Sequence, residues 1–346
     1  MAGKRVTSFD VAKEAGVSRS TVSFVLNNVT RISINEATRQ RVMDAARRLN
    51  YHPDASGRKL VTGKSSTIGL VLQQSADQVF ADAFLLRVML GIEQAVSESG
   101  YHVLLKPYDP TNIQGYSQLI SENLVEGIIL SGPRQDDTEI SQIYESGFPI
   151  ILMGQLNGCD LPFVDINAVE GAATATRHLL QLGHQRIGLI TNASLEYTSA
   201  QQRRQGYLNA LTEAGIVPDE AMIQEGAYTS ASGYQAMQRM LKLPEPPTAV
   251  FVASDVVAIG AMQAIRHAGK RIPQDISIVG FDDVPMAAYV DPPLTTVRLP
   301  AFQLGRRAGE QLTKLILGRP LEKQGELLDI ELVVRESTTG RDLKEL

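Results

Sequence analysis

The sequence is poor in several features that would point to particular classes of protein. It has one cysteine, Cys159, and no tryptophan in 346 residues. A single cysteine excludes a disulfide framework within the chain and is typical of a reducing compartment. No run of about 18 apolar residues occurs, so the sequence predicts no transmembrane helix and no membrane partner. No N-terminal segment resembles a secretory signal, and we therefore expect a cytoplasmic protein.

Motifs of common enzyme classes are also missing. The sequence has no Gly-x-Gly, which excludes the dinucleotide fingerprint, and no Gly-x-Ser-x-Gly elbow. Gly57–Ser65 resembles a phosphate-binding loop, but five residues separate its glycines where that loop has four. The five histidines show no metal-ligand spacing; they are residues 52, 102, 178, 184 and 267. We predict no catalytic activity, no cofactor and no bound metal.

Length and charge indicate more than one folding unit. At about 150 residues per domain, the chain is long enough for two or three units. Residues 1–65 hold 12 Lys and Arg against 5 Asp and Glu, a net charge of +7, and the remainder holds 21 against 33, a net charge of −12. A basic N-terminal segment on an acidic body favours a polyanion as its partner. A solvated, slightly basic surface is the alternative, and charge alone does not decide between them.

Two short helices are predicted near the N-terminus. Ser8 is expected to cap a helix that ends at Gly16, a residue suited to a left-handed turn. Ser18 is expected to cap a second helix that has Val22 on its inner face. A third helix is expected after a capping box at Ser33–Glu36. The spacing is typical of a helix-turn-helix, although a generic three-helix unit would give a similar pattern.

The second helix carries outward residues, nearly all hydrogen-bonding, that begin at its N-terminus. There they could reach base edges and phosphates, and the helix dipole favours an anion. They are Arg19, Ser20, Thr21, Ser23, Phe24 and Asn27. Pro53 ends the third helix, and a basic linker follows in which Leu60 is a lone large apolar residue. Leu60 is interpreted as a wedge for a DNA minor groove, with packing against the body as the alternative.

The rest of the chain alternates short apolar runs with amphipathic stretches. This pattern favours parallel sheets with helices on both faces, in two units rather than one, with ligands at the carboxyl ends of strands. The expected strands are 68–72, 102–106, 127–131, 149–154, 186–191, 249–254 and 276–282. The expected helices include 85–99, 168–182, 200–214, 255–268 and 301–317. Asp282 and Asp283, at the end of the 276–282 strand, form a carboxylate pair that could coordinate a metal or hold hydroxyls, and they are a weak indication of catalysis.

Seven segments together resemble the LacI/GalR family of bacterial transcription regulators. They are DVAKEAGVSRSTVSFVLN (10–27), YHPDASGRKL (51–60), LGHQRIGLIT (182–191), QGYLNALTEAGI (205–216), ISIVGFDDV (276–284), PPLTTVRLP (292–300) and LVVREST (332–338). The resemblance implies a small all-α helix-turn-helix DNA-binding domain, a hinge segment, and an α/β effector-binding and dimerisation domain like periplasmic binding proteins. The implied boundaries are 1–52, 53–66 and 67–346. The last domain is expected to form two subdomains, approximately 67–158 with 295–322 and 159–294 with 323–340.

The resemblance also implies roles for residues that would touch DNA. Arg19, Ser20 and Phe24 match positions that read bases in the major groove. Backbone contacts are expected from Ser8, Ser18, Thr21, Ser23 and Asn27. Leu60 matches the hinge leucine that enters the minor groove, next to Arg58 and Lys59. The chain departs from the family at Phe24, where many members have a polar residue, and at Gly57, where most have alanine. A glycine inside a helix costs about 1 kcal/mol, so a hinge helix here should fold only on DNA.

In the body, the resemblance implies an effector cleft between the subdomains. Arg203 matches a ligand-gripping arginine, Asp282 a carboxylate for ligand hydroxyls or ring nitrogens, and Tyr228 an aromatic that stacks on the ligand. Further lining residues are expected at Phe80, Gln155, Tyr197 and Ser254. An arginine and a carboxylate can both grip vicinal hydroxyls, and an aromatic can cover an apolar ring face. The alternatives are a surface salt bridge for Arg203, a core position for Tyr228 and a helix cap for Ser254.

The sequence thus predicts a homodimeric repressor that binds double-stranded operator DNA and responds to a small-molecule effector. A sugar is the expected effector, and a purine or nucleoside is the other class considered. Effector and DNA would change each other's affinity by the same factor, in either direction. The tail after residue 338 is too short for leucine heptads, which favours a dimer over a tetramer. The competing hypotheses are a sugar-binding receptor without DNA regulation and a cytosolic enzyme.

Overall fold

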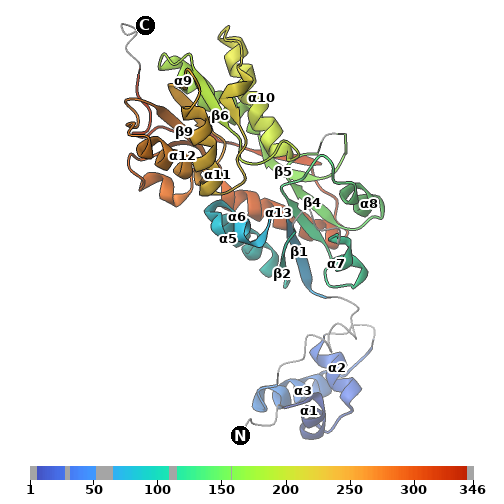
Figure 1. Ribbon diagram of the computed structural model, residues 1–346. Coiled ribbons are helices and arrows are strands. Elements are labelled where there is room, and N and C mark those ends of the chain that lie inside the picture. The colour runs from blue at the N-terminus through green and yellow to red at the C-terminus, as the bar shows by residue number, and fades with distance from the viewer. Residues whose placement is uncertain (1–5, 28–31, 52–64, 109–114, 157, 341–346) are drawn as a thin grey trace. The chain divides into compact units, whose positions relative to one another are not determined.

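The computed structural model describes residues 6–27, 32–51, 65–108, 115–156 and 158–340 (Figure 1). The chain forms two compact units, the N-terminal unit Met1–Ser66 and the C-terminal unit Thr67–Leu346. The described N-terminal unit is helical, and the C-terminal unit combines helices with two six-stranded sheets. The predicted fold class, an all-α unit followed by an α/β unit with two sheets, is confirmed.

Three helices make up the described part of the N-terminal unit. They are α1 (Ser8–Ala15), α2 (Arg19–Leu26) and α3 (Glu36–Arg48). α1 ends at Gly16, whose φ of 64° is a left-handed conformation that glycine adopts at little cost. α2 begins after Ser18, whose hydroxyl accepts the Thr21 N–H at 3.1 Å, as predicted. The three helices share one core of buried side chains: Val11, Ala12, Ala15, Val22, Val25, Val42, Ala45 and Ala46.

Two of the predicted helix caps are wrong. Ser8 is the first residue of α1, and the residue before it takes the capping role. The N–H and hydroxyl of Thr7 both donate to the Asp10 carboxylate, at 2.8 and 2.7 Å, which fixes the start of the helix one residue earlier. α3 begins after Asn35, whose side chain accepts the Thr38 N–H at 2.7 Å. The predicted capping box at 33–36 is therefore replaced by a single asparagine cap.

Two sheets organise the C-terminal unit. The first sheet has the order β11-β5-β4-β3-β1-β2, with all pairs parallel. Its strands are β1 (Thr67–Leu72), β2 (His102–Pro107), β3 (Ile128–Ser131), β4 (Ile150–Met153), β5 (Phe163–Ile166) and β11 (Gly325–Leu328). The second sheet has the order β12-β10-β9-β8-β6-β7 and is parallel except between β10 and β12. Its strands are β6 (Ile187–Ile190), β7 (Ile223–Gln224), β8 (Ala249–Val252), β9 (Ser277–Asp282), β10 (Thr295–Arg298) and β12 (Glu331–Val333).

Helices cover both faces of each sheet, as apolar parallel strands require. On the first sheet, one core includes α6 (Ala83–Ser97) and α13 (Ala301–Ile316), and the other includes α7 (Ser117–Ser121) and α8 (Glu139–Glu145). On the second sheet, one core includes α11 (Ser230–Leu241) and α12 (Asp255–His267), and the other includes α9 (Ala168–Gln181) and α10 (Thr198–Glu213). The short helices are α5 (Ala76–Ala81), η1 (Glu220–Met222) and η2 (Pro285–Ala288).

The chain passes between the two sheets three times. The crossings run from β5 to α9, from β10 to α13 and from β11 to β12. Backbone pairing places β5 and β11 in the first sheet, although 159–294 and 323–340 are expected in the second subdomain. Pairing with β9 likewise places β10 in the second sheet, although 295–322 is expected in the first. The expected subdomain boundaries are corrected accordingly at these three strands.

α6 and α13 lie side by side on the first sheet although they are far apart in sequence (Figure 1). Glycines make this close approach possible. A Cβ atom at Gly91 would overlap the carbonyl oxygen of Phe302, and one at Gly305 would overlap that of Val88. The two backbones therefore meet where no side chain fits between them.

We predict that Gly305→Ala destabilises the C-terminal unit, because its methyl group would collide with the backbone of α6. Overpacking of this kind costs about 1–3 kcal/mol, even though alanine is the better helix former. The measurement is thermal unfolding followed by circular dichroism. Gln303→Ala, at an exposed position of the same helix, is the control and should change the midpoint little. A midpoint equally unchanged in Gly305→Ala would show that the helices do not cross this closely.

Candidate functional site

α2 presents a polar side away from the core of the N-terminal unit. Val22 and Val25 are buried, whereas Arg19 and Ser20 are exposed and Phe24 is half-buried. Arg19 and Ser20 form the first turn of α2, where the helix dipole favours an anion. The three residues expected to read bases thus remain accessible on one short helix.

The residues expected at the DNA backbone also hold the helices in place. The hydroxyls of Ser18 and Thr21 hydrogen-bond to each other at 2.9 Å, and Asn27 Nδ2 donates to Ser23 Oγ at 3.2 Å. Ser8 is half-buried at the start of α1. None of these five side chains is fully buried, so phosphates could still approach them. The expected minor-groove residues lie outside the described part of the chain: Arg58, Lys59 and Leu60.

A cavity lies between the two sheets of the C-terminal unit, at the carboxyl ends of their strands. Residues at or after the ends of β1, β3, β4 and β5 contribute from the first sheet, and residues at or after the ends of β6 to β10 contribute from the second. This is where α/β folds bind ligands. Four of the seven expected effector residues line the cavity: Arg203, Asp282, Tyr228 and Ser254.

Arg203 of α10 is the buried cation of this cavity, and it is only 9% exposed. Its Nη1 donates to the carbonyl oxygen of Ala253 and lies 3.8 Å from Asp282 Oδ1, and its guanidinium carbon lies 4.1 Å from the centre of the Phe281 ring. Its Nε is buried without a hydrogen-bond partner among the described residues. Because an unpaired buried donor is costly, a ligand oxygen at this atom would be stabilised. A surface salt bridge, the alternative for Arg203, does not apply to a buried side chain.

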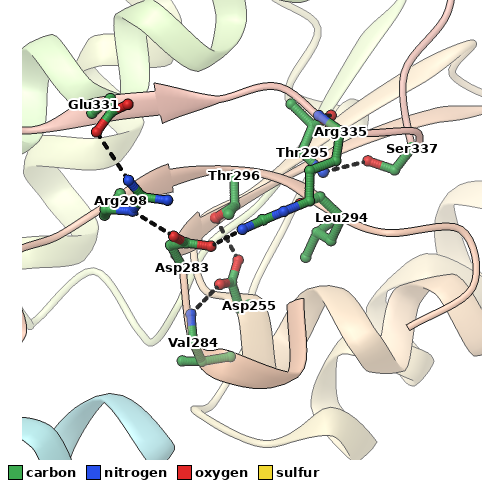
Figure 2. A network of polar contacts seen from close by, with 10 residues as sticks. All are labelled: Asp255, Asp283, Val284, Leu294, Thr295, Thr296, Arg298, Glu331, Arg335 and Ser337. Atoms are coloured by element: carbon green, nitrogen blue, oxygen red, sulfur yellow. Dashed lines mark hydrogen bonds and ion pairs between the residues drawn. The ribbon is translucent and has the colours of Figure 1, made fainter. Parts of the chain in front are cut away.

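Asp282 and Asp283 point in different directions. Their φ values of 123° and 55° are left-handed conformations that strain residues other than glycine and turn the chain between them. Asp282 lines the cavity, whereas Asp283 accepts hydrogen bonds from Arg298 Nε at 2.7 Å and Arg335 Nη2 at 2.6 Å (Figure 2). The two carboxylates therefore do not converge into the paired site that the sequence weakly indicates.

The loop after β9 is also held from the side of α12. Asp255, the first residue of α12, accepts a hydrogen bond from Thr296 Oγ1 at 2.6 Å and another from the Val284 N–H at 2.9 Å (Figure 2). Burial raises the pKa of Asp255 to about 6. Arg335 donates in addition to the carbonyl oxygen of Leu294 at 2.7 Å. Together these bonds tie β9, β10 and the C-terminal segment and fix the position from which Asp282 enters the cavity.

The cavity is also lined by two carboxylates that were not predicted from the sequence. Asp82 directly precedes α6, and its carboxylate accepts a hydrogen bond from the Phe84 N–H at 2.9 Å. Asp165 is the third residue of β5, and its carboxylate accepts a hydrogen bond from Gln155 Nε2 at 2.8 Å. Burial raises the pKa of Asp82, Asp165 and Asp282, and the nearby guanidinium opposes that rise. Gln155 is not among the described lining residues, and its role in the structure is to hold Asp165.

Two tyrosines form one edge-to-face pair at the cavity, with ring centroids 5.6 Å apart. Tyr228 lines the cavity with a φ of 55°, and its hydroxyl accepts a hydrogen bond from Asn192 Nδ2 at 3.2 Å. Burial raises the pKa of Tyr228 to about 12, so it remains neutral. Tyr197 is buried outside the described lining, and its hydroxyl donates to the carbonyl oxygen of Gln73. Phe80 of α5 is 62% exposed and also lies outside that lining.

Ser254 precedes α12, but its side chain makes no capping hydrogen bond. Its hydroxyl instead lies near Asp282 and favours the charged form of that carboxylate. Other polar residues that were not predicted also line the cavity, including Gln74, Asn192, Thr198, Ser199 and Gln202. Several polar lining residues lie within a few residues of the end of a strand. This placement could have indicated them from the sequence.

Backbone contacts join the two halves of the C-terminal unit next to the cavity. Arg134 and Tyr197 form an isolated antiparallel bridge, and the Gln135 N–H donates to the carbonyl oxygen of Glu196 at 2.9 Å. The Arg134 guanidinium lies 5.2 Å from the Tyr197 ring centre and 3.4 Å from a Glu196 carboxylate oxygen. These few bonds hold the segment after β3 against the segment before α10.

Among the residues that the structure describes, no group of three or more His, Cys, Asp and Glu side chains is placed to hold a metal ion. No helix in the described part of the chain has the length and apolar character needed to cross a membrane.

Comparison with known proteins assigns both units. Residues 9–54 match the family of bacterial regulatory proteins, lacI family, and residues 176–338 match a periplasmic binding protein-like domain. The HTH-type transcriptional repressor CytR of Escherichia coli strain K12 is 36% identical over 337 residues, which cover 96% of this chain and 96% of the repressor.

Solved structures show the same similarity. The transcriptional regulator CelR in complex with cellobiose is 32% identical with a TM-score of 0.74, over 96% of this chain and 100% of that one. The lac repressor dimer bound to operator and the anti-inducer ONPF is 30% identical with a TM-score of 0.83, over 97% of this chain and 100% of that one. The likeness therefore extends over both units.

We predict that Arg203→Ala abolishes ligand-induced stabilisation of the chain, because the cavity loses its buried cation. A ligand at about 100 times its Kd adds about 2.7 kcal/mol to the free energy of unfolding. The measurement is a thermal-shift screen with sugars, purines and nucleosides. Arg204→Ala is the matched control, since Arg204 pairs with Glu220 and is not among the described lining residues. Equal ligand-induced shifts in both variants would contradict this cavity as the binding site.

Proposed function

Because this chain belongs to the lacI family of bacterial regulatory proteins, we propose that it is a transcriptional repressor whose operator affinity changes when a small molecule occupies the cavity. It binds operator DNA as a homodimer. This function rests on the presence of both units in one chain. The similarity covers 96% of the CytR repressor and 100% of the lac repressor chain.

The competing functions fit less well. A sugar-binding receptor without DNA regulation would not need the unit at residues 9–54, which matches the lacI family. Regulators of this family are not enzymes, and the carboxylates that the sequence pairs, Asp282 and Asp283, separate in the structure. Since its partner is the operator, we place the protein in the cytoplasm.

We assign the major groove to α2, within a DNA-binding domain at 1–52 that is followed by a hinge at 53–66. Arg19 and Ser20 are exposed at the first turn, and an arginine there can donate two hydrogen bonds to guanine. Phe24, half-buried on the same helix, offers an apolar contact to a thymine methyl group. Ser8, with Ser18, Thr21, Ser23 and Asn27, would contact phosphates and fix the register of the helix.

We assign the effector to the cavity and take a sugar as its chemical class. One relative's structure contains cellobiose. Arg203 Nε and Asn192 Oδ1 are a buried donor and a buried acceptor without partners among the described residues, and sugar hydroxyls satisfy both. Tyr228 supplies an aromatic ring next to these polar groups.

Effector binding and DNA binding can be coupled because the residues that contact the effector come from both sheets. Asp82 and Asp165 belong to the half built on the first sheet, and Arg203 and Asp282 to the half built on the second. A ligand that bonds to both pairs holds the two halves in one arrangement. DNA that favours one arrangement of the halves then changes effector affinity, and effector changes DNA affinity by the same factor.

We predict that Arg19→Ala weakens specific operator binding by about 1–3 kcal/mol, which is about 5- to 150-fold, and relaxes discrimination at one base pair. The measurement is fluorescence anisotropy with an operator obtained by selection and with single-base variants of it. Arg47→Ala, an exposed arginine near the end of α3, removes the same charge and should keep the base preference. Identical base preferences for wild type and Arg19→Ala would contradict the assignment of Arg19.

The hinge assignment has its own test, which comes from the sequence alone. We predict that Leu60→Ala lowers specific operator affinity and leaves weak nonspecific binding largely intact, because a wedge acts only in the correctly docked complex. Titrations with operator and with an unrelated duplex at one salt concentration measure the two affinities. Equal losses on both duplexes would exclude the wedge.

A further inference from the structure

Tyr197 connects the two halves of the C-terminal unit beside the cavity. It lies just before α10, in the half built on the second sheet, and it is only 8% exposed. Its hydroxyl donates a hydrogen bond to the carbonyl oxygen of Gln73, which follows β1 in the half built on the first sheet. Because a buried hydroxyl without a partner is costly, this bond favours the arrangement in which the two residues meet.

Backbone bonds on both sides of Tyr197 join the same two halves. The Gln135 N–H donates to the carbonyl oxygen of Glu196 at 2.9 Å, and the Thr198 N–H donates to that of Pro133 at 3.2 Å. The Thr198 hydroxyl donates to the same Pro133 oxygen, also at 3.2 Å. Since donor and acceptor belong to different halves, each of these bonds must break when the halves separate. Their amide protons therefore report on that separation.

The ring of Tyr197 contacts both the cavity wall and the opposite half. The Arg134 guanidinium, in the segment after β3, lies 5.2 Å from the ring centre. The Tyr228 ring, which lines the cavity, meets the Tyr197 ring edge to face at an interplanar angle of 85°. Edge-to-face pairs have a preferred geometry, so the position of one ring restricts that of the other. Tyr197 thus touches a lining residue although it is outside the described lining itself.

The apolar contacts of Tyr197 are separate from the large cores. Its cluster consists of Ala193, Ala200 and Tyr197, with Tyr228 packed against them. The four cores that hold the two sheets to their helices are different clusters. The side chain of Tyr197 is therefore not part of the packing that stabilises either sheet, and its bond to Gln73 has another role.

We propose that Tyr197 is a positioning residue that latches the two halves together in response to what occupies the cavity. A molecule packed against the Tyr228 ring restrains that ring, and the restrained ring holds Tyr197 where its hydroxyl reaches Gln73. Gln73 ends the strand that begins after the expected hinge at 53–66. The latch thus joins the cavity to the strand that leads to the DNA-binding unit, and this regulatory meaning rests on the proposed function.

Hydrogen exchange of the full chain, measured by mass spectrometry, tests the latch without ligand or DNA. Tyr197→Phe removes the bond to Gln73 and keeps the ring. Peptides that contain the N–H groups of Gln135 and Thr198 should exchange about 2- to 10-fold faster, which is the effect of one lost hydrogen bond on the opening equilibrium. Unchanged exchange of these peptides would overturn the proposal.

Tyr207→Phe is the matched control. The Tyr207 hydroxyl is also buried and donates to a carbonyl oxygen, that of Ile187 at 2.7 Å, but both residues belong to the half built on the second sheet. This variant should lower the unfolding midpoint and leave exchange at Gln135 and Thr198 unchanged, because its bond stays intact when the halves separate. Equal acceleration in Tyr197→Phe and Tyr207→Phe would show a general stabilising role and overturn the latch.

The link to the cavity is tested at Tyr228. Tyr228→Phe removes the hydroxyl that bonds to Asn192 and keeps the ring, whereas Tyr228→Leu removes the ring. Only Tyr228→Leu should accelerate exchange at Gln135 and Thr198, because the ring contacts Tyr197. Equal exchange in the two variants would show that ring packing does not control the latch and would overturn the proposal. Failure of the chain to bind any DNA sequence specifically would instead overturn the proposed function, since none of these measurements uses DNA.

Discussion

The way the chain leaves β9 is the constraint on which the effector site depends. Asp282 and Asp283 both take left-handed conformations, and such backbone strain costs of order 1–3 kcal/mol per residue. Ion pairs from Arg298 and Arg335 to Asp283, and the hydrogen bond from Val284 to the Asp255 carboxylate, hold the turn in place. Because the turn separates the two carboxylates, Asp282 faces Arg203 in the cavity while its neighbour ties the C-terminal segment to the second sheet.

The cavity and the three chain crossings suit a protein in which the two halves of the C-terminal unit change between two relative arrangements. Its carboxylates come from both halves of the C-terminal unit, so bonds to a ligand span the crossings. The halves are also joined beside the cavity by contacts at Arg134 and Tyr197. β1 begins directly after the expected hinge segment, so the first sheet is covalently next to the segment proposed to touch the minor groove.

The sequence predicts those parts of the structure that rest on local patterns. The seven predicted apolar runs form strands, and Gly16 with Ser18 placed the helix-turn-helix. Five strands, including β5 (FVDI) and β10 (TTVR), were missed because polar or charged residues interrupt their short apolar pattern, and the subdomain boundaries failed for the same reason. Arg203 and Asp282 could be placed from the resemblance. Asp165 could not, because its role depends on the missed strand β5 and on packing between distant segments.

The most direct test of this account is selection of DNA from a library of random duplexes by the purified full chain, followed by sequencing of the bound fraction. A dimer that reads bases through α2 of each subunit should enrich one sequence with two-fold symmetry, because symmetric proteins bind symmetric half-sites. Retention of DNA without enrichment of any symmetric sequence, at a level that falls with salt as nonspecific binding does, would contradict the account.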